Sequence, residues 1–295
     1  MPMRPALAAA RPAALPAFSL AHLTLLSTAP AALIDIATAA GYQHVGLRLL
    51  PSAPGGMAWP LMDDPVALRE VQARLRDSGV TVFDLEIVRL SADFNASAYL
   101  RFFETGAALG AQAVLVGADD TDAARCAASY AALCEAAARF GLRPNIEFMP
   151  WTAVRNIRDA ARLIRDAGTP ANSGLLIDAL HFARSDSHVA EVAEVPRGWL
   201  HYAQVCDAPA AIPTTVDGLI HTAREERQLP GEGGIALTPL LAALPADLPL
   251  SVEIPHPARA AAMGEAEWAR EALRTSQRAV QVARDAGAAG LPRSR

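Results

Sequence analysis

The sequence predicts a single (β/α)8 TIM barrel, a fold of the α/β class. Short apolar runs with the length of buried strands alternate with helical segments eight times, at spacings of about 25 to 45 residues. No shift in composition marks a linker, and 295 residues, 52% of them hydrophobic, suffice for one such barrel. Four successive runs in the second half end in an oxygen-bearing side chain, where barrels of this kind place their chemistry.

We expect the barrel to span residues 18–286. Residues 1–17 are rich in alanine and proline, and the prolines interrupt any apolar region. This segment is therefore expected to be a disordered leader and not a signal peptide. Residues 287–295 are expected to form a flexible tail.

The first half of the chain predicts four strand-helix units. Its strands are expected at residues 18–23, 43–49, 80–87 and 113–117, and its helices at residues 28–41, 64–78, 97–109 and 121–140. Thr28 offers a capping hydroxyl and Pro30 a first-turn proline for the first helix, which Gly41 ends. A loop rich in proline and glycine, residues 51–60, is long enough to act as a lid.

The second half predicts the other four units. Its strands are expected around residues 145–148, 174–178, 200–205 and 249–254, and its helices at residues 154–167, 189–194, 237–244 and 265–286. The connection after the seventh strand, residues 207–234, is expected to be a long loop. Loops of this kind set substrate specificity, so the sequence leaves the substrate open.

Composition excludes several classes of function. A formal net charge of -5, with a pI near 5.8, gives no basic field for nucleic acid, and no run approaches the roughly 18 apolar residues of a membrane span. The three cysteines form no CxxC motif, which is typical of reduced thiols in the cytoplasm. All 26 basic residues are arginine, so Schiff-base chemistry on lysine is excluded.

The strand-end residues are Glu147, Asp178, Gln204 and Glu253, on the fifth to eighth strands. Adjacent strands of a barrel would bring their side chains together at its mouth. Buried carboxylates are costly unless they are paired or bind a cation, and an all-oxygen set suits Mn²⁺ or Mg²⁺ better than zinc. The alternative is that each is a separate strand-end residue that faces solvent.

The order of these residues resembles a known family. A strand-end glutamate, Asp178-x-x-His181, Gln204 and a final strand-end glutamate look like the xylose isomerase-like superfamily of sugar phosphate isomerases and epimerases. The resemblance covers nearly the whole chain after residue 17. It implies that Glu147 and Glu253 are metal ligands and the catalytic acid and base, that Asp178 and Gln204 complete the ligand set, and that His181 hydrogen-bonds a substrate oxygen.

A loop supports the same resemblance. Residues 227–233, Arg-Gln-Leu-Pro-Gly-Glu-Gly, look like the Arg-x-x-Pro-Gly-x-Gly loop of the superfamily. The resemblance implies that Arg227 reaches a substrate oxygen, and its planar fork suits a carboxylate, phosphate or hydroxyl pair. The alternative is a surface salt bridge between Arg227 and Glu225 or Glu226.

Further candidates follow the first three strands. Arg48 and Glu86 are expected to face the mouth and bind substrate, and Arg89 and His22 lie at comparable positions. The structural alternatives are a mutual ion pair between Glu86 and Arg89, and a histidine that is simply hydrogen-bonded near its strand.

The predicted function is a metal-dependent isomerase or epimerase of a small keto sugar or related carbonyl compound. One glutamate removes the proton α to the carbonyl, and the other returns it to a metal-stabilised enediolate. Gln204 departs from the histidine that is usual in ketose 3-epimerases and is similar to that of some 3-dehydroshikimate dehydratases. The alternative is therefore a lyase in which the same carbanion loses water.

Two other readings are weaker. An endonuclease IV-like repair enzyme shares the barrel, but it would need a histidine-rich trinuclear zinc site and a basic groove. A barrel that only binds a metabolite would leave the acids buried without a metal, which would destabilise the strand ends. A small-molecule substrate is expected, and the alanine-rich helices are compatible with a homodimer.

Overall fold

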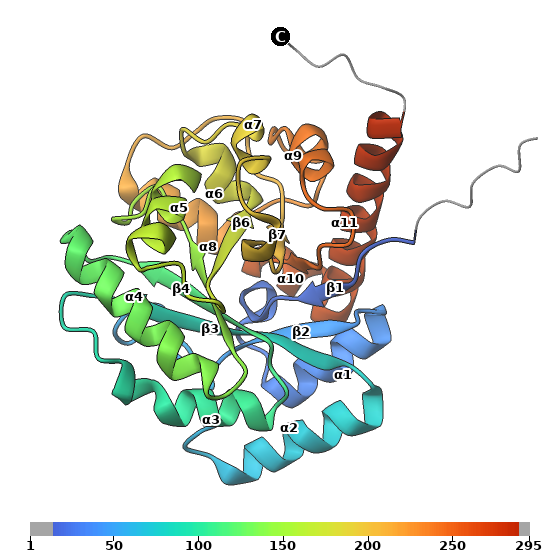
Figure 1. Cartoon of the computed structure of the whole chain (residues 1–295). Helices are drawn as coiled ribbons and strands as arrows, with labels where there is room; N and C mark the ends of the chain where they lie inside the picture. Colours follow the sequence, from blue (N-terminus) through green and yellow to red (C-terminus); the bar gives the residue numbers. More distant parts are fainter. Residues whose placement is uncertain (1–13, 289–295) are drawn as a thin grey trace, which may run out of the picture.

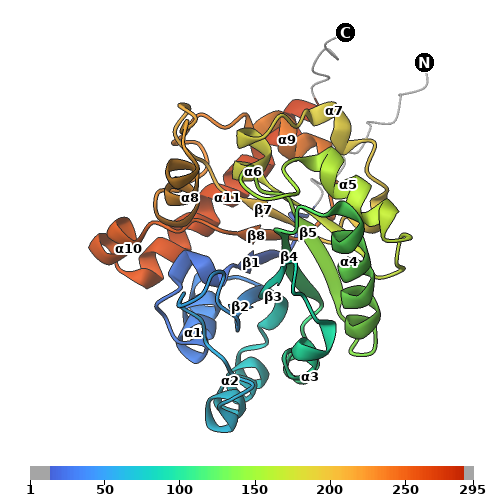
Figure 2. The ribbon, with the colours of Figure 1, turned by 90° about the vertical axis from the view of Figure 1, so that its left-hand side faces the viewer.

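The computed structural model describes residues 14–288. Eight parallel strands pair in chain order, and β1 closes the barrel against β8. The strands are β1 Phe18–Leu20, β2 His44–Arg48, β3 Thr81–Leu90, β4 Ala113–Ala118, β5 Arg143–Glu147, β6 Gly174–Asp178, β7 Ala203–Val205 and β8 Leu250–Val252. Helices surround the strands on all sides in both ribbon views (Figures 1 and 2), which confirms the predicted (β/α)8 barrel.

The helices follow the strands closely. They are α1 Pro30–Ala40, α2 Pro65–Ser78, α3 Leu100–Ala108, α4 Ala123–Ala138, α5 Ile157–Asp166, α6 Ala179–Arg184, α7 Val189–Val192, α8 Val216–Glu225, α9 Leu237–Ala243, α10 Pro257–Met263 and α11 Glu265–Ala288. Short 3-10 turns are η1 His22–Leu25, η2 Ala96–Tyr99 and η3 Arg197–Trp199. Side-chain oxygens cap several helices, as when Asp64 Oδ1 accepts from the Val66 and Ala67 amides at 3.0 Å.

Some boundaries differ from the prediction. Thr28 does not cap α1, because the capping position is Ala29 and the Thr28 hydroxyl has no hydrogen-bond partner among the described residues. The segment 207–234 is not a plain loop, since α8 lies within it and Thr215 Oγ1 caps that helix by accepting from the Gly218 amide. Helices α6 and α10 were also unexpected.

The strands divide the buried side chains into two sets. In β4, Val114 and Val116 pack outward against the helices, whereas Ala113 and Leu115 belong to a smaller cluster on the inner face. Phe83 and Tyr202 join this inner cluster, with their ring centroids 5.1 Å apart. The inner cluster fills part of the barrel below its mouth, together with buried polar side chains such as Ser19, Asp84 and Ser251.

The ends of the chain are partly described. Of the predicted leader, residues 1–13 lie outside the described residues, and the Ala17 carbonyl accepts from the Leu250 amide at 2.9 Å. Of the predicted tail, residues 287 and 288 belong to α11 and the rest lie outside the described residues. Between residues 14 and 288, no helix combines the length and the apolar character needed to cross a bilayer.

Candidate metal centre at the mouth of the barrel

The strand-end residues meet at one point. Glu147 ends β5, Asp178 ends β6 beside Gln204 of β7, and Glu253 follows β8 directly. One carboxylate oxygen from each of the three acids lies within 4.8 Å of the other two. All three acids and Gln204 are buried, so the alternative of separate residues that face solvent is wrong.

Gln204 completes an oxygen-rich set. Its Nε2 donates to Glu253 Oε1 at 2.9 Å, whereas its Oε1 is buried and has no hydrogen-bond partner within residues 14–288. A buried amide oxygen without a donor is costly, and a cation would satisfy it. Three carboxylates and one amide oxygen fit a hard divalent cation.

Arg227 is part of this cluster. Its Nη1 lies 2.6 Å from Asp178 Oδ2, its Nη2 lies 2.9 Å from Glu253 Oε2, and its Nε donates to the Ala223 carbonyl. The side chain is 1% exposed, so the alternative of a surface salt bridge is wrong. The guanidinium holds two of the candidate ligands by charge-assisted hydrogen bonds.

The three acids differ in proton affinity. Burial raises the pKa of Glu147 well above its usual value, and the charges of Glu253 and Asp178 raise it further. Burial also raises the pKa of Glu253 to about 8 against the opposing charge of Arg227. Burial pushes the pKa of Asp178 upward too, but Arg227 and His181 outweigh it and lower the pKa overall. These pKa differences suit Asp178 as a permanent anion beside two groups, Glu147 and Glu253, that exchange protons.

His181 faces Glu147 across the site. Its Nε2 lies 3.7 Å from Glu147 Oε1, and its backbone amide donates to Asp178 Oδ1 at 2.9 Å, which caps α6. Burial lowers the pKa of the imidazole to about 4, so the ring is neutral near pH 7. Trp151 meets the ring edge-on, with centroids 5.0 Å apart. The buried Nδ1 has no partner within the described chain.

Arg48 and Glu86 bind each other. Arg48 Nη2 lies 2.6 Å from Glu86 Oε2, and Arg48 Nε donates to the same oxygen at 2.8 Å. Arg89 pairs with Asp119, and its Nε donates to Asp119 Oδ2 at 2.6 Å. The predicted alternative of an ion pair between Glu86 and Arg89 is therefore wrong.

His22 is held by backbone groups. Its Nδ1 accepts from the Arg48 amide at 2.9 Å, and its Nε2 donates to the Thr28 carbonyl at 3.0 Å. The ring stacks on Trp59, whose Nε1 donates to the Leu26 carbonyl. Both ring nitrogens are occupied, so this histidine fixes the start of the predicted lid and contacts no strand-end acid.

A cavity of about 700 Å³ opens beside the acids. Pro51 to Pro54 of the predicted lid form one wall, and Ile87, Trp151 and Ile220 contribute apolar surface. A smaller recess that shares Ile87 and Trp151 with it is lined by Glu147, His181 and Glu253. The cavity therefore leads from solvent to the acid cluster.

Sequence reasoning missed Arg224, which lines both cavities. No hydrogen bond or ion pair joins its guanidinium to another residue of the described chain. Partial burial, Arg48 and Arg89 lower its pKa from the usual value. A signal was present, because Arg224 precedes Arg227 by about one helical turn, but α8 itself was not predicted.

Asp84 was also missed. This residue of β3 is fully buried, and neither carboxylate oxygen has a hydrogen-bond partner within residues 14–288. Burial raises its pKa well above the usual value, and Glu86 and Glu253 raise it further. Gly46 makes room for it, since a Cβ there would lie 3.0 Å from Asp84 Oδ1. The alternation of Asp84 and Glu86 along the strand was the available signal.

Fold and site together define a barrel with a carboxylate cluster at its mouth. Residues 34–279 match the family model of xylose isomerase-like TIM barrels, so the chain belongs to this family, as the sequence resemblance predicted. The 3-dehydroshikimate dehydratase of Pseudomonas aeruginosa is 32% identical to the chain over 126 residues. This stretch is 41% of the chain and only 19% of that relative's length.

Two solved structures illustrate the likeness in fold. The crystal structure of the IOLI protein with a binding zinc atom has a TM-score of 0.74 and 18% identity, and the match covers 90% of this chain and 98% of that one. L-ribulose 3-epimerase has a TM-score of 0.67 and 16% identity, over 95% and 100% of the two chains. At these identities the likeness shows the shared fold alone.

Proposed function

We propose that the protein is a divalent-metal-dependent enzyme that removes a proton from the carbon beside a carbonyl group. The observation that carries this proposal is the convergence of three buried carboxylates with the unpartnered oxygen of Gln204. Glu147, Asp178, Gln204 and Glu253 would hold the cation. Their oxygen donors favour Mn²⁺ or Mg²⁺, and zinc is the alternative that the IOLI structure suggests.

The bound cation would act as a Lewis acid that stabilises negative charge on a substrate oxygen. The protein's own residues supply the remaining steps. Glu147 or Glu253 takes the proton from carbon, because a carboxylate with a raised pKa is a stronger base near neutral pH. Neutral His181 hydrogen-bonds a substrate oxygen through its unpartnered nitrogen.

Arg227 has a limited role toward substrate. Of the five N–H groups of its guanidinium, Nε serves the Ala223 carbonyl, Nη1 serves Asp178 and the Cys206 sulfur, and one on Nη2 serves Glu253. One N–H of Nη2 is left for a substrate oxygen. We therefore assign Arg227 chiefly to positioning the acids, with a single contact to substrate.

The reaction we favour is a hydro-lyase reaction of the 3-dehydroshikimate dehydratase type. Arg224 offers an unpaired guanidinium to a carboxylate at the mouth, and Ile87, Trp151 and Ile220 suit the face of a carbon ring. Removal of the α proton forms a C=C bond, the β C–O bond breaks, and the hydroxyl leaves as water with a proton from the other glutamate. The curated relative and Gln204 support this choice.

Isomerisation or epimerisation of a keto sugar is the second candidate. Two acids with raised pKa values, Glu147 and Glu253, flank the same site. One can remove the proton, and the other can return it to the opposite face. Arg48 and Glu86, which bind each other near the mouth, would then contact sugar hydroxyls, directly or after exchanging partners.

An NMR assay in D2O with added Mn²⁺ separates the two candidates. For the lyase we expect 3-dehydroshikimate to become an aromatic product, with no exchange into ketohexoses. Deuterium entering a ketohexose beside its carbonyl, without conversion of 3-dehydroshikimate, would replace the lyase by the epimerase. Failure of both substrates to react or to exchange deuterium would contradict both candidates.

A further inference from the structure

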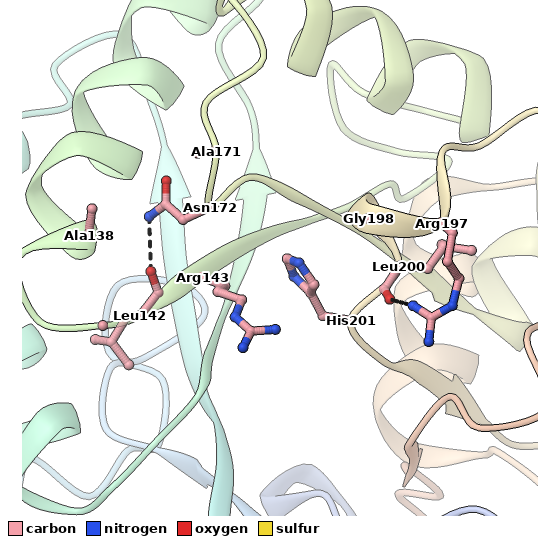
Figure 3. A pocket seen from close by; sticks show the side chains of 10 residues that line it. Ala138, Leu142, Arg143, Ala171, Asn172, Arg197, Gly198, Leu200 and His201 are labelled. Atoms are coloured by element: carbon pink, nitrogen blue, oxygen red, sulfur yellow. Dashed lines mark hydrogen bonds between the residues drawn. The ribbon is translucent and has the colours of Figure 1, made fainter.

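A second polar cavity lies at the opposite end of the barrel, where β5, β6 and β7 begin (Figure 3). Its volume is about 520 Å³. Arg143, Asn172, Arg197 and His201 supply its polar side chains, and its lining contains no aspartate or glutamate. The chain as a whole has more acidic than basic residues. The charge that lines this cavity is therefore opposite in sign to the net charge of the chain.

Arg143 extends its guanidinium into this cavity in Figure 3. The side chain makes no hydrogen bond or ion pair with any residue from 14 to 288. Its backbone belongs to β5, where the amide donates to the Gln112 carbonyl, so the base of the side chain is fixed by the sheet. The backbone of Arg143 is therefore fixed, and the N–H donors of its guanidinium have no protein partner within residues 14–288.

Arg197 lies on the far side of His201 from Arg143 in the same view. Its Nη1 donates to the Leu200 carbonyl at 2.8 Å, and its Nη2 lies 3.1 Å from both oxygens of Asp247. The Asp247 side chain is 79% exposed, so water and salt screen this ion pair. An anion in the cavity can therefore compete with Asp247 for the Arg197 guanidinium.

His201 is held rigidly between the two arginines. Asn145 Nδ2 donates to the Arg143 carbonyl at 2.7 Å, so Asn145 Oδ1 is the acceptor for His201 Nδ1 at 2.9 Å. This bond passes over Gly174, where a Cβ would lie 2.2 Å from Asn145 Oδ1 and 2.6 Å from His201 Nδ1. Glycine at this strand position is thus required for the close approach of the pair.

The pKa of His201 is affected by the positive charges around the cavity. Burial lowers the pKa of His201 to about 4, and the charges of Arg143 and Arg197 contribute to the decrease. An anion in the cavity would reverse the two charge effects. It would therefore favour protonation of the imidazole.

We propose that this cavity is a binding site for a compact polyanion, held by the guanidinium forks of Arg143 and Arg197 on either side of His201. Planar guanidinium groups match both phosphate and carboxylate oxygens, which is the shared chemistry of the ligand. A volume of about 520 Å³ accommodates a small metabolite that carries such groups. The site lies at the end of the barrel opposite to the acids, so this inference does not depend on the proposed function.

The test is an NMR titration of the histidine C2 protons with inorganic phosphate and, separately, malonate at constant ionic strength. The His201 signal is assigned with His201→Asn. We expect phosphate or malonate to shift this signal and to raise the pKa of His201, while His22 stays unchanged. His181 is not used as a control, because we propose that the mouth also binds a carboxylate. The anion that binds more tightly identifies a phosphorylated or a carboxylated ligand.

Two variants control the test. Arg143→Ala should weaken the effect of the anion about tenfold or more, because the partnerless guanidinium is removed. Arg69→Ala, an exposed arginine on α2, makes the same change in net charge and should leave the affinity unchanged. The inference is overturned if neither anion shifts His201, or if both variants bind like the unmodified protein.

Discussion

The two ends of the barrel carry opposite chemistry on the same strands. Strand β5 begins at Arg143, which has no partner among the described residues, and ends at Glu147, which lies among acids. At the mouth, Arg227 pairs with two of the three buried carboxylates, Asp178 and Glu253, and the cluster of three acids favours a cation. At the other end, two arginines and a histidine face a cavity without acids. We propose that the two ends of the same strands therefore serve ligands of opposite charge.

The arginines of the mouth show the same principle on a smaller scale. Arg48 binds Glu86, Arg89 binds Asp119, and Arg227 binds Asp178. Arg224 has no such partner within residues 14–288. Arginines with a protein partner are held by the fold, whereas Arg224 combines an unpaired guanidinium with a position on the cavity that leads to the acids.

The largest expected effect comes from Glu147→Gln. This change keeps an oxygen donor but removes the base, so turnover should fall about 10³-fold, or about 4 kcal/mol in the barrier. Steady-state kinetics would measure it, with circular dichroism to check the fold. Arg143→Ala at the opposite end should leave turnover within about twofold, and a comparable loss there would break the contrast between the two ends.

Stability should fall in acid because buried histidines must become charged. Burial holds the pKa of His22 at about 4 in the folded chain, against 6.5 when unfolded. The unfolded state therefore binds the proton first, so the stability that neutral His22 supports is complete above pH 6.5 and is lost as the pH falls towards 4.

The variant His22→Gln removes the contribution of His22 to the pH dependence of stability. Urea unfolding should show that its stability decreases less between about pH 7.5 and 5 than that of the unmodified protein, by about 2 kcal/mol. Equal pH dependence in the two proteins would mean that His22 titrates normally when folded.

Arg224→Met tests the unpaired arginine at the mouth. If it binds a substrate carboxylate, KM for 3-dehydroshikimate should rise about 10- to 100-fold, with a smaller effect on kcat, because the interaction is present before and during the reaction. Arg69→Met is the matched control and should behave normally. An unchanged KM would remove Arg224 from the substrate site.

The smallest expected effect compares His201, which is partly buried, with His22, which is fully buried. Arg143→Ala removes a positive charge near His201, so the pKa of His201 should rise from about 4 by a fraction of a unit. The pKa of His22, which is lowered by burial far from Arg143, should not change. NMR titration reports both values in one experiment, and parallel changes would show that the effect is not local.

Much of the fold could be predicted from the sequence because each strand is a short apolar run and each unit repeats the same pattern. The position of Glu147, Asp178, Gln204 and Glu253 at successive strand ends was visible for the same reason. Helix α8 carried a weaker signal: Val216, Leu219, Ile220 and Ala223 recur at helical spacing, but Gly218 lowers the helix propensity of this ten-residue segment.

Pairing between distant residues could not be predicted. Arg227 and Asp178 are 49 positions apart, and only the closed barrel shows that the arginine is buried against the acids and not exposed beside Glu225. The basic cavity at the other end was invisible for the same reason. Arg143 begins strand β5, whereas Arg197 lies in the turn η3 and His201 follows it, and neither segment carries a recognisable motif.

The most direct test of the central claim is metal binding by the four mouth residues. Elemental analysis of protein purified without chelator, followed by titration with Mn²⁺, should give close to one equivalent per chain. Asp178→Asn should reduce the affinity strongly, because it removes one anionic ligand and the partner of Arg227, whereas Arg143→Ala should bind normally. No bound metal and no response to Mn²⁺, Mg²⁺ or Zn²⁺ would contradict the assignment of the acid cluster.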